Sequence, residues 1–187
     1  SNFTDFLMLE HAEHIALRYV DQPMELGTPD LVILPGTKNT MDDLRWLRGS
    51  GMEAMIAKAH AKGSILFGIC GGYQMLGQQI SDPMMTEGGG TLQGLGYLPT
   101  ETVFGAEKTL TRVHGCISSV TGALRELSGC PVDGYEIHMG ETQIADDAST
   151  LVQLQDDTND TKKPDGVACD TVYGSYVHGF FDGEGVV

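Results

Sequence analysis

The junction at Cys70 restricts the fold most, because an apolar run passes there into a helical pattern with no loop between them. Residues 64–69 are apolar or small and read as a buried strand. Two glycines follow Cys70 directly, and residues 73–79 carry a helical pattern. A strand that turns at once into a helix needs small residues around the turn, and it presents the turning residue at the carboxyl edge of a sheet.

A second strand and two helices are expected before this junction. Residues 30–35 form a short β-branched run, as in a buried parallel strand. The pattern then predicts two helices, one capped by Asn39 or Thr40 and ending at Leu47, the other over residues 52–62. Alternating strands and helices favour right-handed βαβ crossovers. The sequence therefore predicts an α/β fold: a flavodoxin-like or Rossmann-like, mostly parallel sheet with helices on both faces.

The rest of the chain is richer in alternating patterns. Residues 14–20 are a candidate strand, whereas residues 81–96, with a proline and three consecutive glycines, read as a loop. The polar, acidic residues 145–165 are expected to form a surface loop or a hairpin end. No repeat or linker divides residues 1–187, so one domain is predicted, with an antiparallel portion added from about residue 97 to 140. Further strands are expected over residues 97–104, 108–114, 134–141 and 172–178.

The charge of the chain argues against two classes of partner. The sequence holds 26 acidic and 11 basic residues, for a formal net charge of -15. Nucleic acids and anionic membrane surfaces both require a positive face, so neither is an expected partner. There is no apolar run long enough to span a bilayer and no secretory signal at the start, so a cytoplasmic location is expected.

Cys70 is the one cysteine of four whose context indicates reactivity. The amino end of the following helix and its backbone N–H groups would stabilise negative charge on the sulfur and on an oxyanion. The other three cysteines form no CxxC pair and no metal-like cluster, so no metal site is expected. Among six histidines, His178 is the best partner base because it ends an apolar strand. A glycine-rich turn around an unreactive buried cysteine remains the alternative.

Four motifs, in order along the chain, resemble one family. They are LPGTK at 34–38, GICGGYQ at 68–74, GYEIHMG at 134–140 and YVHGFFD at 176–182. Together they look like the class I glutamine amidotransferases of the cobyric acid and cobyrinic acid diamide synthase type. The opening SNFTDF resembles the segment that joins the ATP-using domain of cobyric acid synthases to their glutaminase domain. The resemblance spans nearly the whole chain and implies the class I glutamine amidotransferase fold.

The resemblance also implies a mechanism. Cys70 would attack the side-chain amide of glutamine, with His178 as general base and later as acid to the leaving ammonia. Backbone N–H groups beside the nucleophile would hold the oxyanion. The residues expected at the oxyanion and glutamine site are Gly36, Thr37, Gly71, Gln74, Tyr135 and His138.

The chain departs from many class I glutaminases just after the histidine. Those enzymes have a glutamate two residues later, which orients the imidazole, and Phe180 stands there in this chain. Asp182 and Glu184 follow at spacings that do not match. A backbone carbonyl or a carboxylate from elsewhere is therefore expected to fix the imidazole.

Family members of this type carry a further domain. An amino-terminal synthetase domain uses ATP and Mg²⁺ to amidate carboxylates of a corrinoid, cobyrinic acid a,c-diamide, whereas this chain has no GxxxxGK[ST] loop. The resemblance therefore implies no cofactor in this domain, with glutamine and the synthetase domain, where the corrinoid binds, as its partners. Three alternatives stay open. They are the glutaminase of a cobyrinic acid diamide synthase or of a complex that amidates a cell-wall lipid, a docking domain that has lost catalysis, and a cysteine peptidase or related hydrolase.

Overall fold

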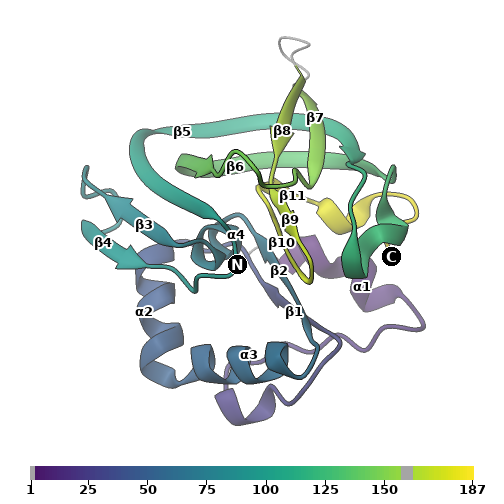
Figure 1. The fold of residues 1–187 in the computed structure, drawn as a ribbon, viewed down its shortest axis with the longest axis horizontal. Helices are drawn as coiled ribbons and strands as arrows, with labels where there is room; N and C mark the ends of the chain where they lie inside the picture. The colour runs from purple at the N-terminus through teal and green to yellow at the C-terminus, as the bar shows by residue number, and fades with distance from the viewer. Residues whose placement is uncertain (1–2, 157–161) are drawn as a thin grey trace.

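Two β-sheets organise the computed structural model, which describes residues 3–156 and 162–187 (Figure 1). The central sheet has the order β1-β2-β10-β9. Strands β1 (Leu31–Leu34), β2 (Ile65–Ile69) and β10 (Val172–Ser175) run parallel, and β9 (Val167–Cys169) pairs antiparallel with β10. Their short apolar runs suit strands that are covered on both faces. The mostly parallel α/β sheet that the sequence predicts is confirmed.

Helical segments cover both faces of this sheet. On one face, α4 (Gly71–Leu76) lies so close that a Cβ atom on Gly68 would meet the Tyr73 backbone nitrogen at 2.6 Å. On the other face, the Phe67 ring packs against two phenylalanines of the short helix η4 (Phe180–Asp182), with ring centroids 4.8 and 5.2 Å apart. Neighbouring residues of a strand point to opposite faces of the sheet, so α4, which packs at Gly68, and η4, which packs at Phe67, lie on opposite faces.

Two longer helices connect β1 to β2. Helix α2 (Thr40–Ser50) begins where Asn39 accepts a hydrogen bond from the backbone N–H of Asp42, at 2.8 Å, as the sequence predicts. It ends at Gly51, whose φ of 86° suits glycine, and α3 (Met52–Ala61) follows directly. The apolar faces of both helices contribute buried residues to the core, among them Leu44 and Ile56.

The second sheet is larger and mostly antiparallel. Its longest strands, β5 (Thr100–Ile117) and β6 (Pro131–Ile144), pair along most of their length, with a register shift between Val103 and Lys108. The parallel pair of β3 and β5 is an exception. The remaining strands are β3 (Gln79–Asp82), β4 (Gly90–Gln93), β7 (Val152–Asp156), β8 (Lys162–Asp165) and β11 (Val177–His178).

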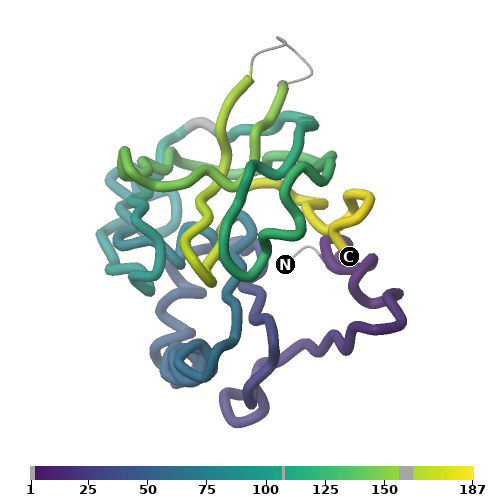
Figure 2. Tube along the Cα trace, turned by 45° about the vertical axis from the view of Figure 1, so that its right-hand side comes forward, coloured from purple at the N-terminus to yellow at the C-terminus, as the bar shows by residue number. Residues whose placement is uncertain are grey.

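Residues 3–30 run around the outside of the central sheet (Figure 2). They contain η1 (Phe3–Phe6), α1 (Leu7–His11) and η2 (Pro23–Glu25). Both η1 and α1 contact η4, so the start of the chain lies beside its end. A further short helix, η3 (Gly122–Leu127), joins β5 to β6.

Two sequence predictions of helix and loop are wrong in their extents. The helix expected over residues 73–79 runs from Gly71 and ends at Leu76, because Gly77 is extended and Gln79 already pairs in β3. The loop expected over residues 81–96 contains the end of β3 and all of β4. Its three glycines have positive φ and close a hairpin that the sequence did not indicate.

Three strand predictions also need correction. Residues 14–20 form no strand. Residues 97–104 and 108–114 belong to one strand that starts only at Thr100 and runs on to Ile117. The acidic segment 145–165 contains β7 and β8, although residues 157–161 lie outside the described part of the chain. The antiparallel portion accordingly extends well beyond residues 97–140.

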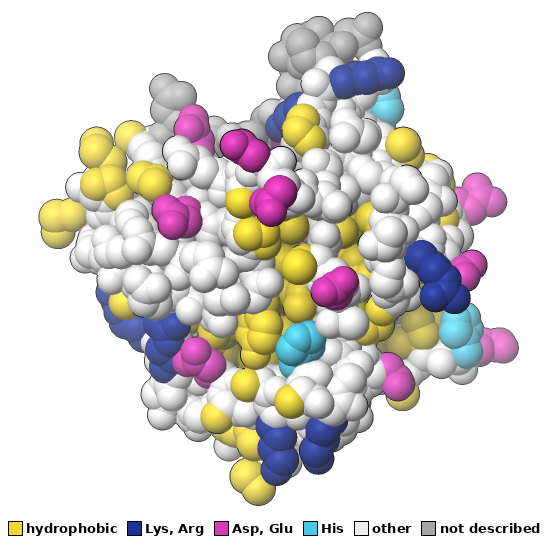
Figure 3. All heavy atoms as spheres, viewed as in Figure 1, with side chains coloured by type: hydrophobic (Ala, Val, Ile, Leu, Met, Phe, Trp, Pro, Cys, Tyr) yellow, Lys and Arg dark blue, Asp and Glu magenta, His cyan; other side chains and the backbone are white. Residues whose placement is uncertain are grey.

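The excess acid is dispersed over the surface that Figure 3 draws. Asp and Glu side chains lie separately on this face, some of them beside Lys, Arg or His, and gather in no continuous acidic patch (Figure 3). A dispersed charge of this kind fits a role in solubility. Within residues 3–156 and 162–187, no helix has both the length and the apolar character needed to cross a membrane.

Candidate active site

Cys70 occupies a strained turn between β2 and α4. Its φ is 51° and its ψ is -110°, which is an unfavourable conformation for any residue with a Cβ atom. The two glycines that follow leave no space for side chains. A Cβ atom on Gly72 would lie 1.9 Å from the Leu34 carbonyl oxygen, and one on Gly71 would lie 2.1 Å from Thr37 Oγ1. The sequence CGG thus permits the tight junction that places the sulfur at the carboxyl edge of the sheet, where Cys70 is buried.

His178 lies beside Cys70, although it arrives from the second sheet. Strand β10 ends at Ser175, and β11 then pairs antiparallel with β6, so that His178 stands opposite Tyr135. A Cβ atom on Gly36 would lie 2.8 Å from His178 Cε1 and 3.7 Å from both His178 Nε2 and the Cys70 Cβ. The His178 imidazole and the Cys70 side chain therefore both lie next to Gly36. The sequence had placed His178 at the end of a parallel strand, whereas its own strand is antiparallel.

Asp5 supplies the carboxylate that the sequence lacked near residue 180. One of its oxygens lies 2.8 Å from His178 Nδ1, and the other accepts the backbone N–H of Gly179 at 3.0 Å. The Asp5 side chain is 3% exposed, and that of His178 is 12% exposed. The contact joins residues 173 positions apart in the sequence. Since Asp5 holds Nδ1, the other ring nitrogen is left for Cys70.

The surroundings of His178 favour its protonated form. Burial alone would lower the pKa of this imidazole, but hydrogen bonds to Asp5 and Cys70, together with the charges of both, raise it to about 10. An imidazolium at neutral pH is the natural partner of a thiolate. The Cys70 sulfur also lies 3.3 Å from the carbonyl oxygen of Ile137, in β6.

Three of the predicted oxyanion residues, Gly36, Thr37 and Gly71, lie close to Cys70. Thr37 packs on Gly71, and its hydroxyl shares a hydrogen bond of 2.9 Å with Thr40. A Cβ atom on Gly36 would contact both Cys70 and His178, as described above. Residues 36 and 37 follow β1, and Gly71 begins α4, so the three lie close to Cys70 and to one another.

Gln74 lies beneath the site rather than in its opening. The side chain is buried, and its amide oxygen accepts a hydrogen bond from Thr40 at 3.2 Å. Its amide nitrogen donates to the Met139 carbonyl and to the Tyr176 hydroxyl, each at 3.1 Å. Gln74 thus ties α4 to α2, β6 and the strand that leads to His178. The predicted contact with substrate remains a prediction, and it would require these bonds to rearrange.

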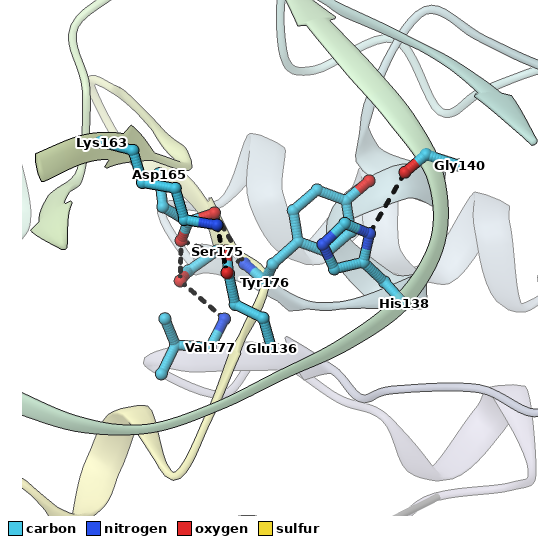
Figure 4. Close-up of polar contacts among 8 residues, drawn as sticks. All are labelled: Glu136, His138, Gly140, Lys163, Asp165, Ser175, Tyr176 and Val177. Atoms are coloured by element: carbon cyan, nitrogen blue, oxygen red, sulfur yellow. Dashed lines mark hydrogen bonds and ion pairs between the residues drawn. The ribbon is translucent and has the colours of Figure 1, made fainter. Parts of the chain in front are cut away.

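Tyr135 and His138 lie on opposite faces of β6, and only Tyr135 is the cross-strand neighbour of His178. Tyr135 is cross-strand from His178 and half exposed. The His138 ring instead stacks on Tyr176, with centroids 3.7 Å apart, and its Nδ1 lies 3.2 Å from the Gly140 carbonyl oxygen (Figure 4). Burial lowers the pKa of His138.

His138 faces a second, polar pocket of about 330 Å³. The buried Glu136 forms an ion pair there with Lys163, and Asp165 accepts hydrogen bonds from the Ser175 hydroxyl and the Tyr176 backbone N–H (Figure 4). Burial raises the pKa of Asp165 to about 7. These bonds brace the turn at Tyr176 that carries the chain from β10 to β11. In the described residues no group of three or more His, Cys, Asp or Glu side chains could hold a metal ion.

Sequence reasoning missed Asp5 and the carbonyl of Ile137. A backbone carbonyl leaves no trace in a sequence. For Asp5, the available signal was a single acidic residue between two phenylalanines in the opening motif, which had been interpreted only as a linking segment.

Substitution of Gly36 by alanine tests how closely the pair is held. The added Cβ would press on the imidazole at 2.8 Å, so we expect kcat for a reaction that uses Cys70 and His178 to fall by about 10²-fold, because a displacement near 1 Å has that cost. Gly49→Ala is the matched control, since a Cβ there meets nothing within 4 Å. Steady-state kinetics with thermal unfolding of both variants checks this. Equal kcat for the two variants would show that the imidazole has room to move.

Comparison with known proteins shows the family to which this chain belongs. A family model of CobB/CobQ-like glutamine amidotransferase domains matches residues 1–186. Cobyric acid synthase of Ruminiclostridium cellulolyticum is 48% identical over 189 residues, which cover 100% of this chain and 37% of that protein. Cobyric acid synthase of Lachnoclostridium phytofermentans is 45% identical over 194 residues, covering 100% and 38%. The chain thus spans little more than a third of the curated relatives it matches.

Solved structures share the fold at much lower identity. A protein described as a glutamine amidotransferase aligns with a TM-score of 0.63 and 18% identity, over 97% of this chain and 87% of that chain. A glutamine amidotransferase from Thermotoga maritima aligns with a TM-score of 0.54 and 16% identity, over 94% and 69%. These likenesses agree with the class I glutamine amidotransferase fold that the sequence motifs predicted.

Proposed function

The chain belongs to the family of CobB/CobQ-like glutamine amidotransferase domains, and on that premise we propose that it hydrolyses glutamine at Cys70 and His178. The observation that supports this most is the contact of Asp5 with His178 beside the strained Cys70. A buried carboxylate, an imidazole and a sulfur in this order are what a nucleophilic thiol enzyme requires. A docking domain without catalysis would have no need for any of the three.

The first half of the reaction forms a thioester. The Cys70 thiolate attacks the side-chain amide carbon of glutamine, and the carbonyl electrons move to the oxygen. Backbone N–H groups of Gly71 and of Gly36 or Thr37 stabilise that oxyanion. As the oxyanion collapses, the C–N bond breaks and the leaving nitrogen takes the proton of His178, which releases ammonia and leaves a neutral imidazole.

The second half restores the enzyme. Neutral His178 takes a proton from water, whose oxygen attacks the thioester carbon. The C–S bond then breaks, glutamate leaves, and the site returns to thiolate and imidazolium. Asp5 accepts the Nδ1–H hydrogen bond and stabilises the imidazolium, so it is a positioning residue.

We further propose that the ammonia serves an amidation in a longer protein. The relatives described above are named cobyric acid synthase, and this chain matches only 37–38% of each. On this proposal a synthetase domain of the same polypeptide uses ATP and Mg²⁺ to amidate carboxylates of cobyrinic acid a,c-diamide, in the cytoplasm, where thiols stay reduced. The names of these relatives favour cobyric acid synthase over the diamide synthase and the lipid-amidating complex.

A glutamine-mimicking electrophile tests the proposed site. We expect 6-diazo-5-oxo-norleucine to label the full-length protein once, on Cys70, and to stop release of ¹⁵N-ammonia from amide-labelled glutamine in parallel with labelling. Peptide mapping by mass spectrometry identifies the adduct. An adduct on the exposed Cys116 or Cys169, with Cys70 unmodified, would overturn the assignment.

A further inference from the structure

Two direct crossings between the β-sheets lie side by side. Strand β8 belongs to the second sheet and β9 to the central sheet, and only Gly166 separates Asp165, the last residue of β8, from β9. Strand β10 belongs to the central sheet and β11 to the second sheet, with Tyr176 alone between them. Strand β11 ends at His178, so this second crossing determines where the imidazole lies.

Asp165 joins the two crossings through hydrogen bonds (Figure 4). Its carboxylate accepts the Ser175 hydroxyl, and it also accepts the Tyr176 backbone N–H at 3.2 Å. The Ser175 hydroxyl oxygen in turn accepts the Val177 backbone N–H at 3.1 Å. An ionised carboxylate only accepts hydrogen bonds. The bonds from Val177 to Ser175 and from Ser175 to Asp165 therefore have one fixed direction.

Ser175 also holds the backbone of the nucleophile. Its carbonyl oxygen accepts the backbone N–H of Cys70 at 2.9 Å, and the residue is fully buried. One serine thus binds the turn at Cys70 through its carbonyl and the crossing toward His178 through its hydroxyl. Within the residues that the structure describes, Asp165 has no hydrogen bond to the Cys70 or His178 side chain. Any effect of Asp165 on that pair passes through the crossing.

Burial disfavours the charge that these bonds require. It raises the pKa of Asp165 to about 7, against the hydrogen bond from Ser175, and the charge of the neighbouring Glu136 acts in the same direction as burial. Lys163, which pairs with Glu136, lowers the pKa of Asp165. The other titratable groups on this pocket are Tyr73, His138, Glu141 and Tyr176. A neutral asparagine of the same shape would avoid the cost of a buried charge, so the fold alone gives no reason for a carboxyl group here.

We propose that Asp165 is a positioning residue of the candidate site, and that its ionised form sets the geometry of Cys70 and His178 through Ser175. The inference rests on the proposed function, because it assumes that this pair hydrolyses glutamine. A protonated Asp165 carries a hydroxyl in place of one acceptor, so it no longer accepts both bonds from the crossing in the same way. The crossing then loosens, and the imidazole and the sulfur lose their alignment.

Asp165→Asn in the full-length protein tests the positioning role. The amide keeps the shape of the carboxylate but replaces one acceptor with a donor, so we expect kcat for ammonia release to fall by about 10- to 100-fold. KM for glutamine should change by less than about threefold, because Asp165 does not bind substrate. Glu141→Gln is the matched control, since Glu141 is an exposed carboxylate on the same pocket. Its kcat should stay within about twofold of the unmodified protein.

The pH dependence distinguishes this role from a loss of packing. The ratio of kcat between the unmodified protein and Asp165→Asn should be largest at high pH, where Asp165 is ionised. It should shrink as the pH falls through about 7, where the unmodified protein takes up a proton on this carboxyl group. Titrations that the two proteins share cancel in the ratio. A ratio that stays the same from about pH 5.5 to about 8.5 would overturn the proposal, since a pKa near 7 changes the ionised fraction over that range.

Alkylation of Cys70 by iodoacetamide tests the same geometry without glutamine. A displaced imidazole stabilises the thiolate less, so the rate constant at about pH 8 should fall about tenfold in Asp165→Asn and stay unchanged in Glu141→Gln. Mass spectrometry of the Cys70 peptide follows the adduct. If the unmodified protein released no ammonia from glutamine, the proposed function would fail, and alkylation would still decide the role of Asp165. Equal rate constants in the two variants would overturn that role.

Ser175→Ala keeps the proposal open to refutation if Asp165→Asn does not fold, as thermal unfolding will show. It removes the hydroxyl that joins the crossing to Asp165 and leaves the carboxyl group in place. We expect a fall in kcat of similar size, and unchanged kcat would contradict the proposal. Where both single variants fold, the double variant should be no slower than the slower of the two, because both changes break one chain of hydrogen bonds. Additive losses would mean that Asp165 acts by another route.

Discussion

Replacement of Cys70 by alanine is expected to lower kcat/KM for glutamine hydrolysis by about 10⁴-fold or more. On the proposed mechanism the sulfur forms the covalent intermediate, and loss of a nucleophile that acts with its base removes nearly all of the catalysis. The turn itself should persist, because alanine keeps the Cβ atom and the two glycines are unchanged. Ammonia release by the full-length protein, with glutamine titrated across KM, measures the effect.

Cys169→Ala is the matched control for this loss. Cys169 is an exposed free thiol at the end of β9, on the same sheet but away from the turn. We expect its kcat/KM to stay within about twofold of the unmodified protein, as for most surface substitutions. Activity of Cys70→Ala within tenfold of the original, with purity confirmed, would refute a covalent mechanism at this residue.

Substitutions of His178 and Asp5 by asparagine are expected to be strongly non-additive. His178→Asn should reduce kcat by about 10⁴-fold, because it removes both base and acid. Asp5→Asn should reduce kcat by about 10²-fold, because the imidazole keeps its position less well and loses the ionic partner. Since Asp5 acts only through His178, the double variant should be no slower than His178→Asn alone. Additive losses would mean that Asp5 has a separate role.

The pH dependence gives Asp5 a signature that misfolding would not produce. The pKa of His178 is raised to about 10, in part by Asp5, so Asp5→Asn should move the alkaline fall of kcat to lower pH. A raised pKa contributes stability that is complete below the unfolded value near 6.5 and is lost as pH rises through about 10. The difference in unfolding free energy between the unmodified protein and Asp5→Asn should therefore shrink as the pH rises from about 6.5 to about 10. Asp182→Asn, a nearby carboxylate without a contact to the imidazole in the described residues, is the control for charge.

The parts of the fold that follow local patterns were predictable. Strands β1 and β2 are short apolar runs next to clear helix signals. The glycines that follow Cys70 indicate the tight turn at that residue. The alternating pattern predicts only parts of the paired strands β5 and β6. A register shift after Val103 interrupts the alternation that is typical of a strand. Residues 14–20 have the correct pattern but no neighbour to pair with, and pattern alone does not make a strand.

The geometry of the candidate site was predictable for two of its three side chains. Cys70 and His178 each sit in motifs whose neighbours are informative, whereas Asp5 acts across 173 positions of sequence. Side chains alternate between the two faces of β6, and this alternation determines on which face each predicted residue lies. Tyr135 lies on the side of His178, and His138 lies on the face of the second pocket. A motif alone does not reveal which face of a strand each residue occupies.

The order of Asp5, Cys70 and His178 along the polypeptide bears on when the domain can first act during its synthesis. Within this domain the imidazole is added to the growing chain more than a hundred residues after the sulfur. Over that interval a nascent chain carries Asp5 and Cys70 without His178. On the proposed mechanism, glutamine hydrolysis cannot begin until translation of this domain is almost finished.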